Sequence, residues 1–422
     1  ATTTPTLEVG TNYGYLEVDN DVDFYAVELA AGQFYTFTYN GGVASEAVDP
    51  GESLGVMGLY NAAGTAVVGL SINTGGELGI SYYATTGGTY YLRAEAGDKY
   101  GFGPAVQTGG YTIDVREQDP DNMNPLEAFI WDSANNVEPR EGDGNTVYIY
   151  FAPAGENLTP GETNLGWQQH QIDAVMHALE HGYTPITGYD YVITNDIDQA
   201  TFKMITVQNQ TYGARFYPQD EASYGDLAGV GSFNLLSGGF GSDPNSLLPG
   251  GFSYGVILHE FGHAHGIAHP HDTGGGSEIL VGVTASTGSF GLYDLNQGVY
   301  TVMSYNDGWN THPDGDRNYS AANRASGWSE TLGAFDIGTL VARGYSGPAY
   351  NAGDNVYTIA DTQAEASYQT IWDNGGVDEI AYVGTRDTQI DLLAATLDYS
   401  PTGGGAISFA RGVWGGYTIA NG

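Results

Sequence analysis

Cysteine is absent from all 422 residues of this chain, so no disulfide can stabilise it. Basic residues are also scarce: 11 lysines and arginines stand against 50 aspartates and glutamates, and Lys99 and Lys203 are the only lysines. No apolar run reaches the length that spans a membrane. The first ten residues lack the basic and hydrophobic parts of a signal peptide, so we expect that one was removed or that export uses another route.

The shortage of positive charge restricts the partners that the chain can have. A formal net charge of −39 repels phosphate backbones and anionic lipid, so we expect neither nucleic acid nor a membrane surface as a partner. The same carboxylates are suitable ligands for calcium, which is therefore a candidate replacement for the missing disulfides.

Glycine and tyrosine are abundant in this chain, whereas charged residues are few. With 64 glycines, 32 tyrosines and only 14% charged residues, the composition favours short strands and turns over long surface helices. The length predicts two to three domains.

One stretch, YGVILHEFGHAHGIAHPH, contains most of the predicted chemistry. An α-helix advances about 3.6 residues per turn, so His259 and His263 share one face and can direct two imidazoles at one cation. Glu260 lies beside the first of them, where a carboxylate can reach a water on the metal without being a ligand itself. This spacing predicts a metal-binding helix that carries its own general base.

The residues after this helix predict a third ligand. Gly266 accepts a positive φ and so ends the helix, which allows the chain to turn back and present His269. Three neutral imidazoles with one open position are typical of a catalytic zinc site, whereas a structural site is closed by a fourth protein ligand. Met303 follows in TVMSY, and the extended motif with such a Met-turn is typical of metzincin metalloproteases.

The other histidines do not fit this spacing. We expect His265 and His271 to support the ligands or face solvent. The remaining four histidines (His170, His177, His181 and His312) are expected to be unrelated to metal.

Residues 1–117 read as short strands, with alternating apolar and polar residues and a hairpin predicted at Asn61–Gly64. This pattern predicts a small antiparallel β-sandwich. The segments at residues 21–25, 30–35 and 87–90 resemble the pre-peptidase C-terminal-type domain that is attached to many secreted bacterial proteases. Asp19, Asp21 and Asp23 have a spacing seen in calcium loops, but no glycine or glutamate follows at the required positions, so we predict a turn.

A second domain is predicted at residues 118–345. A linker rich in proline, acids and amides separates it from the first domain. Beyond the linker, strand-like runs such as VYIYFAP and TFKMITVQ accompany a helix predicted over residues 167–180. A strand-rich sheet, a supporting helix and the metal helix make an α+β domain with a cleft between the sheet edge and the metal helix.

The chain from about residue 147 onwards resembles the serralysin family of secreted zinc metalloproteases. Pro270 directly after His269 and the VMSY turn carry this resemblance. It implies that Tyr305 lies close to the zinc, as a ligand at rest and a hydrogen-bond donor during turnover, and that Met303 forms an apolar floor beneath the histidines. It also implies that an edge strand pairs with extended substrate through its main chain. That strand would include Gly213, Ala214, Arg215 and Phe216.

The resemblance extends to residues 346–422, which we interpret as the start of a calcium-binding, β-rich C-terminal domain. Two glycine-rich turns match segments that jointly hold calcium in serralysins. The implied ligands are Asn351, Gly353, Asp354 and Asn355 in the first turn and Asp373, Gly375 and Asp378 in the second. Ala420 stands where the family has a calcium-binding glutamate, so we predict one calcium ion where typical relatives bind two. We also predict that this calcium holds the segment onto the catalytic domain.

Serralysins normally continue into Gly-Gly-x-Gly-x-Asp repeats, and this sequence stops where they should begin. We therefore expect a processed or truncated form. The fold class that results is multidomain, with an α+β metzincin catalytic domain between an N-terminal antiparallel β-sandwich and a β-rich C-terminal segment.

The predicted function is that of a secreted, extracellular zinc endopeptidase, acting on protein and peptide substrates as a monomer. His259, His263 and His269 would bind zinc, Glu260 would be the general base, and Tyr305 would stabilise the oxyanion. Two alternatives remain at this point: a zinc hydrolase of non-peptide amides, and a non-catalytic adhesin or binding protein that uses the N-terminal sandwich.

Overall fold

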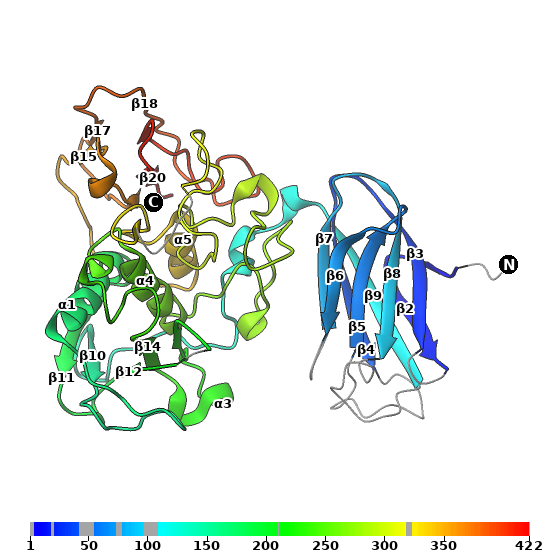
Figure 1. The fold of residues 1–422 in the computed structure, drawn as a ribbon, viewed down its shortest axis with the longest axis horizontal. Helices are drawn as coiled ribbons and strands as arrows, with labels where there is room; N and C mark the ends of the chain where they lie inside the picture. The colour runs from blue at the N-terminus through cyan, green and yellow to red at the C-terminus, as the bar shows by residue number, and fades with distance from the viewer. Residues whose placement is uncertain are drawn as a thin grey trace. The chain divides into compact units, whose positions relative to one another are not determined.

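The computed structural model describes residues 4–17, 21–41, 55–72, 78–96, 109–209, 211–317 and 323–421 (Figure 1). The chain divides into two compact units, residues 1–123 with 281–284 and residues 124–280 with 285–422. The domain boundaries expected at residues 117 and 345 stay predictions. Of the three aspartates predicted to form a turn, Asp19 lies outside the described residues, whereas Asp21 directly precedes the strand Val22–Leu29 and Asp23 lies within it.

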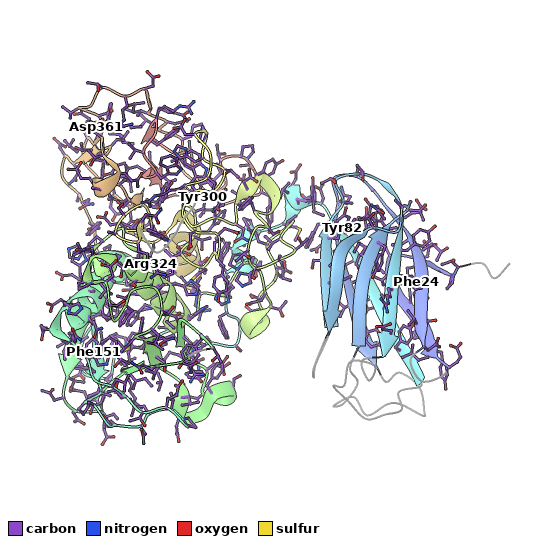
Figure 2. All side chains as sticks on the ribbon, viewed as in Figure 1. Phe24, Tyr82, Phe151, Tyr300, Arg324 and Asp361 are labelled. Carbon is purple, nitrogen blue, oxygen red and sulfur yellow. The ribbon has the colours of Figure 1, made fainter. Side chains whose placement is uncertain are left out.

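The first unit is built from strands. They are β1 (Thr6–Leu7), β2 (Gly10–Leu16), β3 (Val22–Leu29), β4 (Phe34–Gly41), β5 (Gly55–Asn61), β6 (Ala66–Ile72), β7 (Leu78–Tyr83), β8 (Gly88–Ala96) and β9 (Gly109–Gln118). One sheet has the order β1-β3-β8-β5-β6 and the other β2-β9-β4-β7. Phe24 and Tyr82, labelled in Figure 2, belong to different sheets. All pairings except that of β1 with β3 are antiparallel.

Alternation along the strands produces the core of this unit. In β3, Tyr25, Val27 and Leu29 are buried, because every second side chain of a strand points to the same face. Buried residues from both sheets form one apolar cluster. The predicted hairpin is present: Gly64 has a φ of 75° and donates its N–H to the Asn61 carbonyl (2.9 Å) between β5 and β6. The strand-rich character predicted for this segment is confirmed.

Two short 3-10 turns lie at the predicted linker: Pro120–Asn122 ends the first unit and Pro125–Ala128 begins the second. The main sheet of the second unit contains β10 (Thr146–Phe151), β11 (Asp190–Thr194), β12 (Phe202–Val207), β13 (Ala214–Phe216) and β14 (Val230–Asn234). The order is β11-β10-β12-β14-β13. Strands β11, β10, β12 and β14 are parallel to one another, and β13 pairs with β14 in the antiparallel direction at one edge of the sheet. The other side of β13 therefore pairs with no described strand.

Helices accompany this sheet (Figure 1). They are α1 (Gln169–Ala178), α2 (Thr184–Thr187), α3 (Glu221–Tyr224), α4 (Phe252–Ala264) and α5 (Ala334–Ala342), and a π-helical turn at Leu179–Tyr183 joins α1 to α2. Helix α4 is almost entirely buried and lies against α1 and β13. The fold is therefore β-rich, with several sheets and few helices.

The C-terminal part of the second unit consists of short strands. They are β15 (Val356–Thr358), β16 (Tyr368–Ile371), β17 (Glu379–Ala381), β18 (Thr388–Gln389), β19 (Phe409–Ala410) and β20 (Gly416–Ile419). They pair as β15–β17, β16–β20 and β18–β19.

Residues 409–414 are in direct contact with the loop that follows the predicted Met-turn. The Phe409 ring packs on Trp309 and His312 at centroid distances of 5.1 and 4.9 Å. Arg411 Nη1 donates to Asp314 Oδ1 at 2.7 Å, next to a second hydrogen bond from Gly412 N to the same carboxylate. These contacts attach residues 409–414 directly to this loop.

In the described part of the chain, no helix has both the length and the apolar character needed to cross a lipid bilayer.

Candidate metal centre

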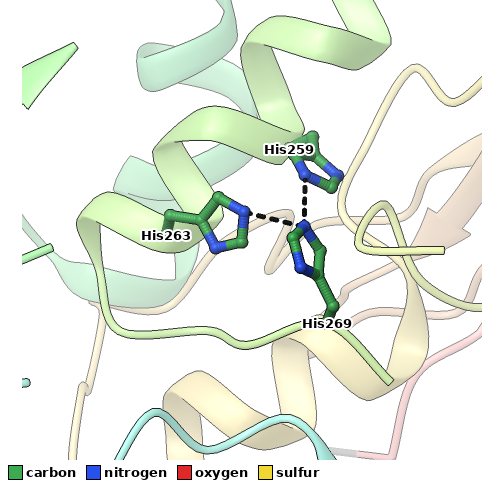
Figure 3. Close-up of side chains that lie close together, drawn as sticks. All are labelled: His259, His263 and His269. Carbon is green, nitrogen blue, oxygen red and sulfur yellow. Dashed lines mark hydrogen bonds between the residues drawn. The ribbon is translucent and has the colours of Figure 1, made fainter. Parts of the chain in front are cut away.

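Helix α4 and the turn after it bring three histidines together (Figure 3). His263 Nε2 lies 3.0 Å and His259 Nε2 lies 3.1 Å from His269 Nε2. The helix ends because Gly266 has a φ of 82°, and a Cβ at this position would lie 2.5 Å from the Arg343 guanidinium. The chain then reverses and presents His269, as the spacing predicts.

The Nδ1 atom of each histidine is already occupied. His259 Nδ1 bonds to the Val302 carbonyl (2.7 Å) and His263 Nδ1 to the Ile267 carbonyl (2.9 Å). Carbonyl oxygens only accept, so these Nδ1 atoms carry the protons and their Nε2 atoms carry lone pairs.

His269 Nδ1 is held in the same way by a carboxylate, Asp272 Oδ2, at 2.8 Å. Three Nε2 lone pairs therefore converge and repel one another unless a cation lies between them. This donor set fits zinc, which prefers neutral imidazole ligands.

Burial keeps the imidazoles neutral. Burial, reinforced by the neighbouring His269, lowers the pKa of His259 to about 3, and the same causes hold the pKa of His263 well below its usual value. Uncharged imidazole is the form that binds a metal, so the site is preorganised for a cation near neutral pH.

Glu260 is adjacent to the ligands on α4. Its side chain is 5% exposed, and its Oε2 is buried without a hydrogen-bond partner among the described residues. Burial raises the pKa of Glu260 to about 8. A divalent cation nearby would lower this pKa again, which suits a group that must both take up and release a proton.

Met303 lies beneath α4. It is fully buried, and its sulfur lies only 2.6 Å from the position that a Cβ on Gly262 would occupy. The turn that carries it is held by Asp336, at the first turn of α5. The Asp336 carboxylate accepts hydrogen bonds from Thr301 Oγ1 (2.7 Å) and from Val302 N (2.8 Å).

Tyr305 lies over the histidines. Its ring centroid is 4.9 Å from that of His269 and 4.5 Å from that of His271, and the residue is 46% exposed. Burial, with the negative charges of Glu260 and Asp272, raises the pKa of Tyr305 to about 12, so the phenol stays protonated and able to donate.

His265 has a different role from the ligands. It is fully buried, stacks on Tyr183 at 4.6 Å and bonds through Nε2 to the Tyr191 hydroxyl (2.8 Å). These contacts place it in the core behind α4.

A cleft of about 480 Å³ opens in front of this centre. His259, Glu260 and Tyr305 line it, and so do Gly213 and Ala214 of the predicted substrate strand. Asp307 also lines it. Burial raises the pKa of Asp307 to about 6, while a hydrogen bond with Trp328 acts in the opposite direction.

The other two residues predicted to bind substrate do not line this cleft. Phe216 is buried, with its ring 5.5 Å from that of Phe202 and 5.2 Å from that of Phe261. Arg215 forms an ion pair with Glu162 (2.8 Å) and lies over the Tyr212 ring. The side chains of Arg215 and Phe216 therefore fix the strand, while Gly213 and Ala214 face the cleft.

Glu162 collects four donors onto one carboxylate. Tyr212 OH, Asn209 Nδ2 (2.9 Å), Arg215 Nη2 (2.8 Å) and Thr159 Oγ1 (2.9 Å) all bond to it. Burial alone would raise the pKa of Glu162, but these donors outweigh it and hold the pKa below its usual value. Glu162 thus links the loop of residues 156–164 to the strand at the cleft.

The two glycine-rich turns lie side by side across β15 and β17. Asp378 Oδ1 accepts from Asn355 N (3.0 Å) and Asp354 Oδ1 accepts from Val377 N (2.9 Å). Asp373 accepts from Tyr357 OH (2.6 Å). The three predicted aspartate ligands do not form one group with ligand atoms within 4.8 Å of each other.

Main-chain oxygens, in contrast, do converge in the first turn. The Asn355 side-chain amide N–H group donates to Gly353 O (2.5 Å) and to Asn351 O (2.9 Å), which brings these two carbonyl oxygens together. Asn351 adopts a φ of 51°, which asparagine tolerates better than most residues.

In the second turn, the Gly375 N–H donates to Asp373 Oδ1 at 3.1 Å. Ala420 is buried, and its N–H donates to Ile371 O (2.9 Å). Its methyl side chain offers no carboxylate to an ion.

Sequence reasoning missed Asp272, Asp336, Glu162 and Asp307. Asp272 had a weak signal, since it follows the third ligand by three residues. Asp307 follows the TVMSY turn by two residues, whereas Asp336 and Glu162 lie far from the motifs in sequence and are brought to them only by the fold.

Curated relatives with similar sequences are metallopeptidases. The chain is 28% identical over 305 residues to serralysin of Proteus mirabilis, covering 66% of this chain and 60% of that protein. It is 30% identical over 173 residues to metallopeptidase AprA of Pseudomonas marginalis, covering 37% of this chain and 33% of that protein. The chain thus spans less than two thirds of the length of either relative. No family model matches the chain.

Solved structures give more distant likenesses. The pre-peptidase C-terminal domain of a collagenase from Bacillus anthracis matches with a TM-score of 0.21 and 16% identity, over 26% of this chain and 93% of that domain. The lysozyme inhibitor PliG of Aeromonas hydrophila matches with a TM-score of 0.20 and 15% identity, over 28% and 96%.

Proposed function

We propose that this protein is a secreted zinc endopeptidase of the serralysin type, with a metzincin catalytic domain. One observation carries the proposal: three imidazole Nε2 atoms converge at about 3 Å beside a buried glutamate, at the base of a cleft bordered by an edge strand. The similarity to two metallopeptidases supports it.

His259, His263 and His269 would hold the zinc. When bound, zinc supplies a Lewis acid that polarises the scissile carbonyl and lowers the pKa of a water molecule. Glu260 takes a proton from the attacking water and passes it to the leaving amine. Because its Oε2 has no partner in the described structure, the carboxylate needs to give up no other hydrogen bond to do so.

Tyr305 acts on the transition state. Its protonated phenol donates a hydrogen bond to the oxyanion that develops on the carbonyl. The free side of β13 binds extended peptide through its main chain, beginning at Gly213 and Ala214. Main-chain pairing is indifferent to side chains, which suits the digestion of varied proteins.

Calcium is the second proposed cofactor. The carbonyl oxygens of Asn351 and Gly353, which both accept from the Asn355 amide N–H group, form the part of the proposed ligand set that converges; Asn355 would offer its amide oxygen once the ion replaces these hydrogen bonds. Asp354, Asp373, Gly375 and Asp378 would complete it on binding. Secretion and a separate role for the C-terminal segment rest on the serralysin resemblance.

Substitution of Glu260 tests this proposal most directly. We expect Glu260→Ala to retain zinc while casein hydrolysis falls by on the order of 10²–10⁴, because only the proton carrier is removed. Glu180→Ala, an exposed glutamate of the same unit, is the matched control. Zinc analysis and casein digestion are run on all three proteins, with and without chelator. A wild-type chain that binds zinc but cleaves no protein, or a mutant that loses zinc, would contradict the assignment.

A further inference from the structure

The cleft continues along α4 beyond the catalytic glutamate. Phe252, Gly255 and Val256 on the first turns of α4 line one wall of this extension. Asp307 and Trp328 line it from other segments. This extension therefore combines apolar walls with the carboxylate of Asp307, and Ser304 and Ser329 also line the cleft.

Glycines keep this part of the cleft open. A Cβ on Gly255 would meet its nearest neighbour, Trp328 Cβ, only at 3.9 Å, so the missing side chain at position 255 leaves open space between Phe252 and Val256. Gly298 and Gly308 also line the cleft, and they pack so closely that a Cβ on Gly298 would lie 2.7 Å from Gly308 N. The pocket can accordingly hold a long side chain from a bound peptide.

Asp307 is half-buried and has no cationic partner. No arginine, lysine or histidine among the described residues forms an ion pair with it. Arg317 and Arg324 are near the pocket walls, but they stack on the rings of Trp328 (5.2 Å) and Phe252 (5.7 Å). A carboxylate in such a setting has lost part of its hydration, and a cation is its natural partner.

We infer that this pocket selects a basic side chain, arginine or lysine, directly next to the scissile bond, with Asp307 as the specificity-determining residue. The inference rests on the proposed peptidase function. The aliphatic stem of such a side chain packs against Val256 and the aromatic walls, and its charged end reaches Asp307. Arginine gains most, because its planar guanidinium can form two hydrogen bonds with one carboxylate.

Quenched fluorescent peptides that differ at one position test this inference. Two series place arginine, citrulline, lysine or leucine directly before or directly after the scissile bond. Citrulline has nearly the shape of arginine but no charge. We expect kcat/KM for arginine to exceed that for citrulline about 10- to 100-fold in one series, the range of a charged hydrogen bond.

Variants assign the preference to its residue. Asp307→Asn should bring the arginine-to-citrulline ratio close to one while the leucine peptide is still cleaved, and Asp307→Glu should restore part of the ratio. Asp294→Asn, which removes an exposed carboxylate outside the cleft, should leave the ratio unchanged. A ratio near one in the wild type, or a preference that survives in Asp307→Asn, overturns the inference.

A second test needs no variant: whole proteins are digested with the wild-type enzyme and the cleaved bonds are mapped. Enrichment of arginine and lysine at one position beside the cut supports the inference, and their absence from both positions refutes it. Cleavage of casein without a basic preference would leave the proposed function intact and refute only the role of Asp307. Failure to cleave any peptide would refute both.

Discussion

At the scale of single residues, the Asp272 carboxylate orients His269, the third proposed zinc ligand. It accepts a hydrogen bond from His269 Nδ1 at 2.8 Å and also accepts Gly274 N at 2.9 Å. The carboxylate thereby fixes both the tautomer and the orientation of the His269 ring.

We expect Asp272→Asn to weaken zinc binding about 10- to 100-fold, because the amide keeps the shape but loses the charge that makes His269 a strong ligand. A competition titration with a chromogenic chelator measures this change. Asp226→Asn, an exposed residue, should bind zinc like the wild type. Equal zinc affinity in Asp272→Asn would show that the carboxylate has no influence on the ligand.

Tyr305 is the second residue with a separable role. We expect Tyr305→Phe to lower kcat and kcat/KM together, by roughly 10²–10³, since an oxyanion donor acts only in the transition state. Zinc content should stay the same, because three histidines remain. Steady-state kinetics of the wild type and of Tyr305→Phe on one peptide measure this effect. An unchanged kcat would show that the tyrosine takes no part in the chemical step.

At the scale of elements, β13 depends on one carboxylate. Asn209, Tyr212 and Arg215 on or before this strand all bond to Glu162. In the proposed function, the free side of the strand can pair with substrate only if its backbone is held in place, so we propose Glu162 as a positioning residue.

We expect Glu162→Ala to raise KM about 5- to 30-fold with little change in kcat, because the strand binds substrate but takes no part in the chemistry. Glu156→Ala is the matched control. It lies in the same loop and accepts a hydrogen bond from Tyr150 OH (2.8 Å), but has no partner on the strand. An effect on kcat alone, or equal effects of both variants, would contradict this role.

The sequence predicts local elements better than it predicts their partners. The ligands of α4 follow from helix geometry, and Gly266 follows from its backbone requirement, so both are visible in a short stretch of sequence. Asp336 and Glu162 reach their partners only through the tertiary fold, and no periodicity marks them. The burial of Phe216 could not be predicted from the sequence either, because a three-residue strand has too little alternation to show which face is buried.

At the scale of the whole molecule, we propose that direct contacts and calcium share the attachment of the C-terminal segment. Residues 409–414 bond directly to the loop at 309–315, whereas the turns at 351–355 and 373–378 hold each other mainly through carboxylates and backbone amides. Calcium should therefore matter most for the two turns.

We expect removal of calcium with a calcium-selective chelator to lower the melting temperature while zinc is retained. A ligand at a hundredfold excess over its Kd contributes about 2.7 kcal/mol to the stability of the folded form. Hydrogen exchange should rise at residues 351–378 and stay slow at residues 409–414. Asp373→Ala combined with Asp378→Ala should reproduce this pattern at saturating calcium.

The number of calcium ions is a further part of this prediction. Because Ala420 offers no carboxylate, we expect one ion per chain, measured by metal analysis of the zinc-loaded protein. Two bound calcium ions at these turns would contradict the count, and a melting curve indifferent to calcium would contradict the mechanism.

The contact of residues 409–414 with the Met-turn side of the cleft also sets an order of events during synthesis. A ribosome delivers the zinc-ligand helix about 150 residues before it delivers Phe409 and Arg411, as the numbering of the chain shows. Until those late residues emerge, the loop at 309–315 lacks the ring of Phe409 and the ion pair with Arg411. The nascent chain thus acquires the three clustered histidines early but completes the loop beside Tyr305 and Asp307 late, so the proposed active-site cleft is fully formed only after residues 409–414 have been made.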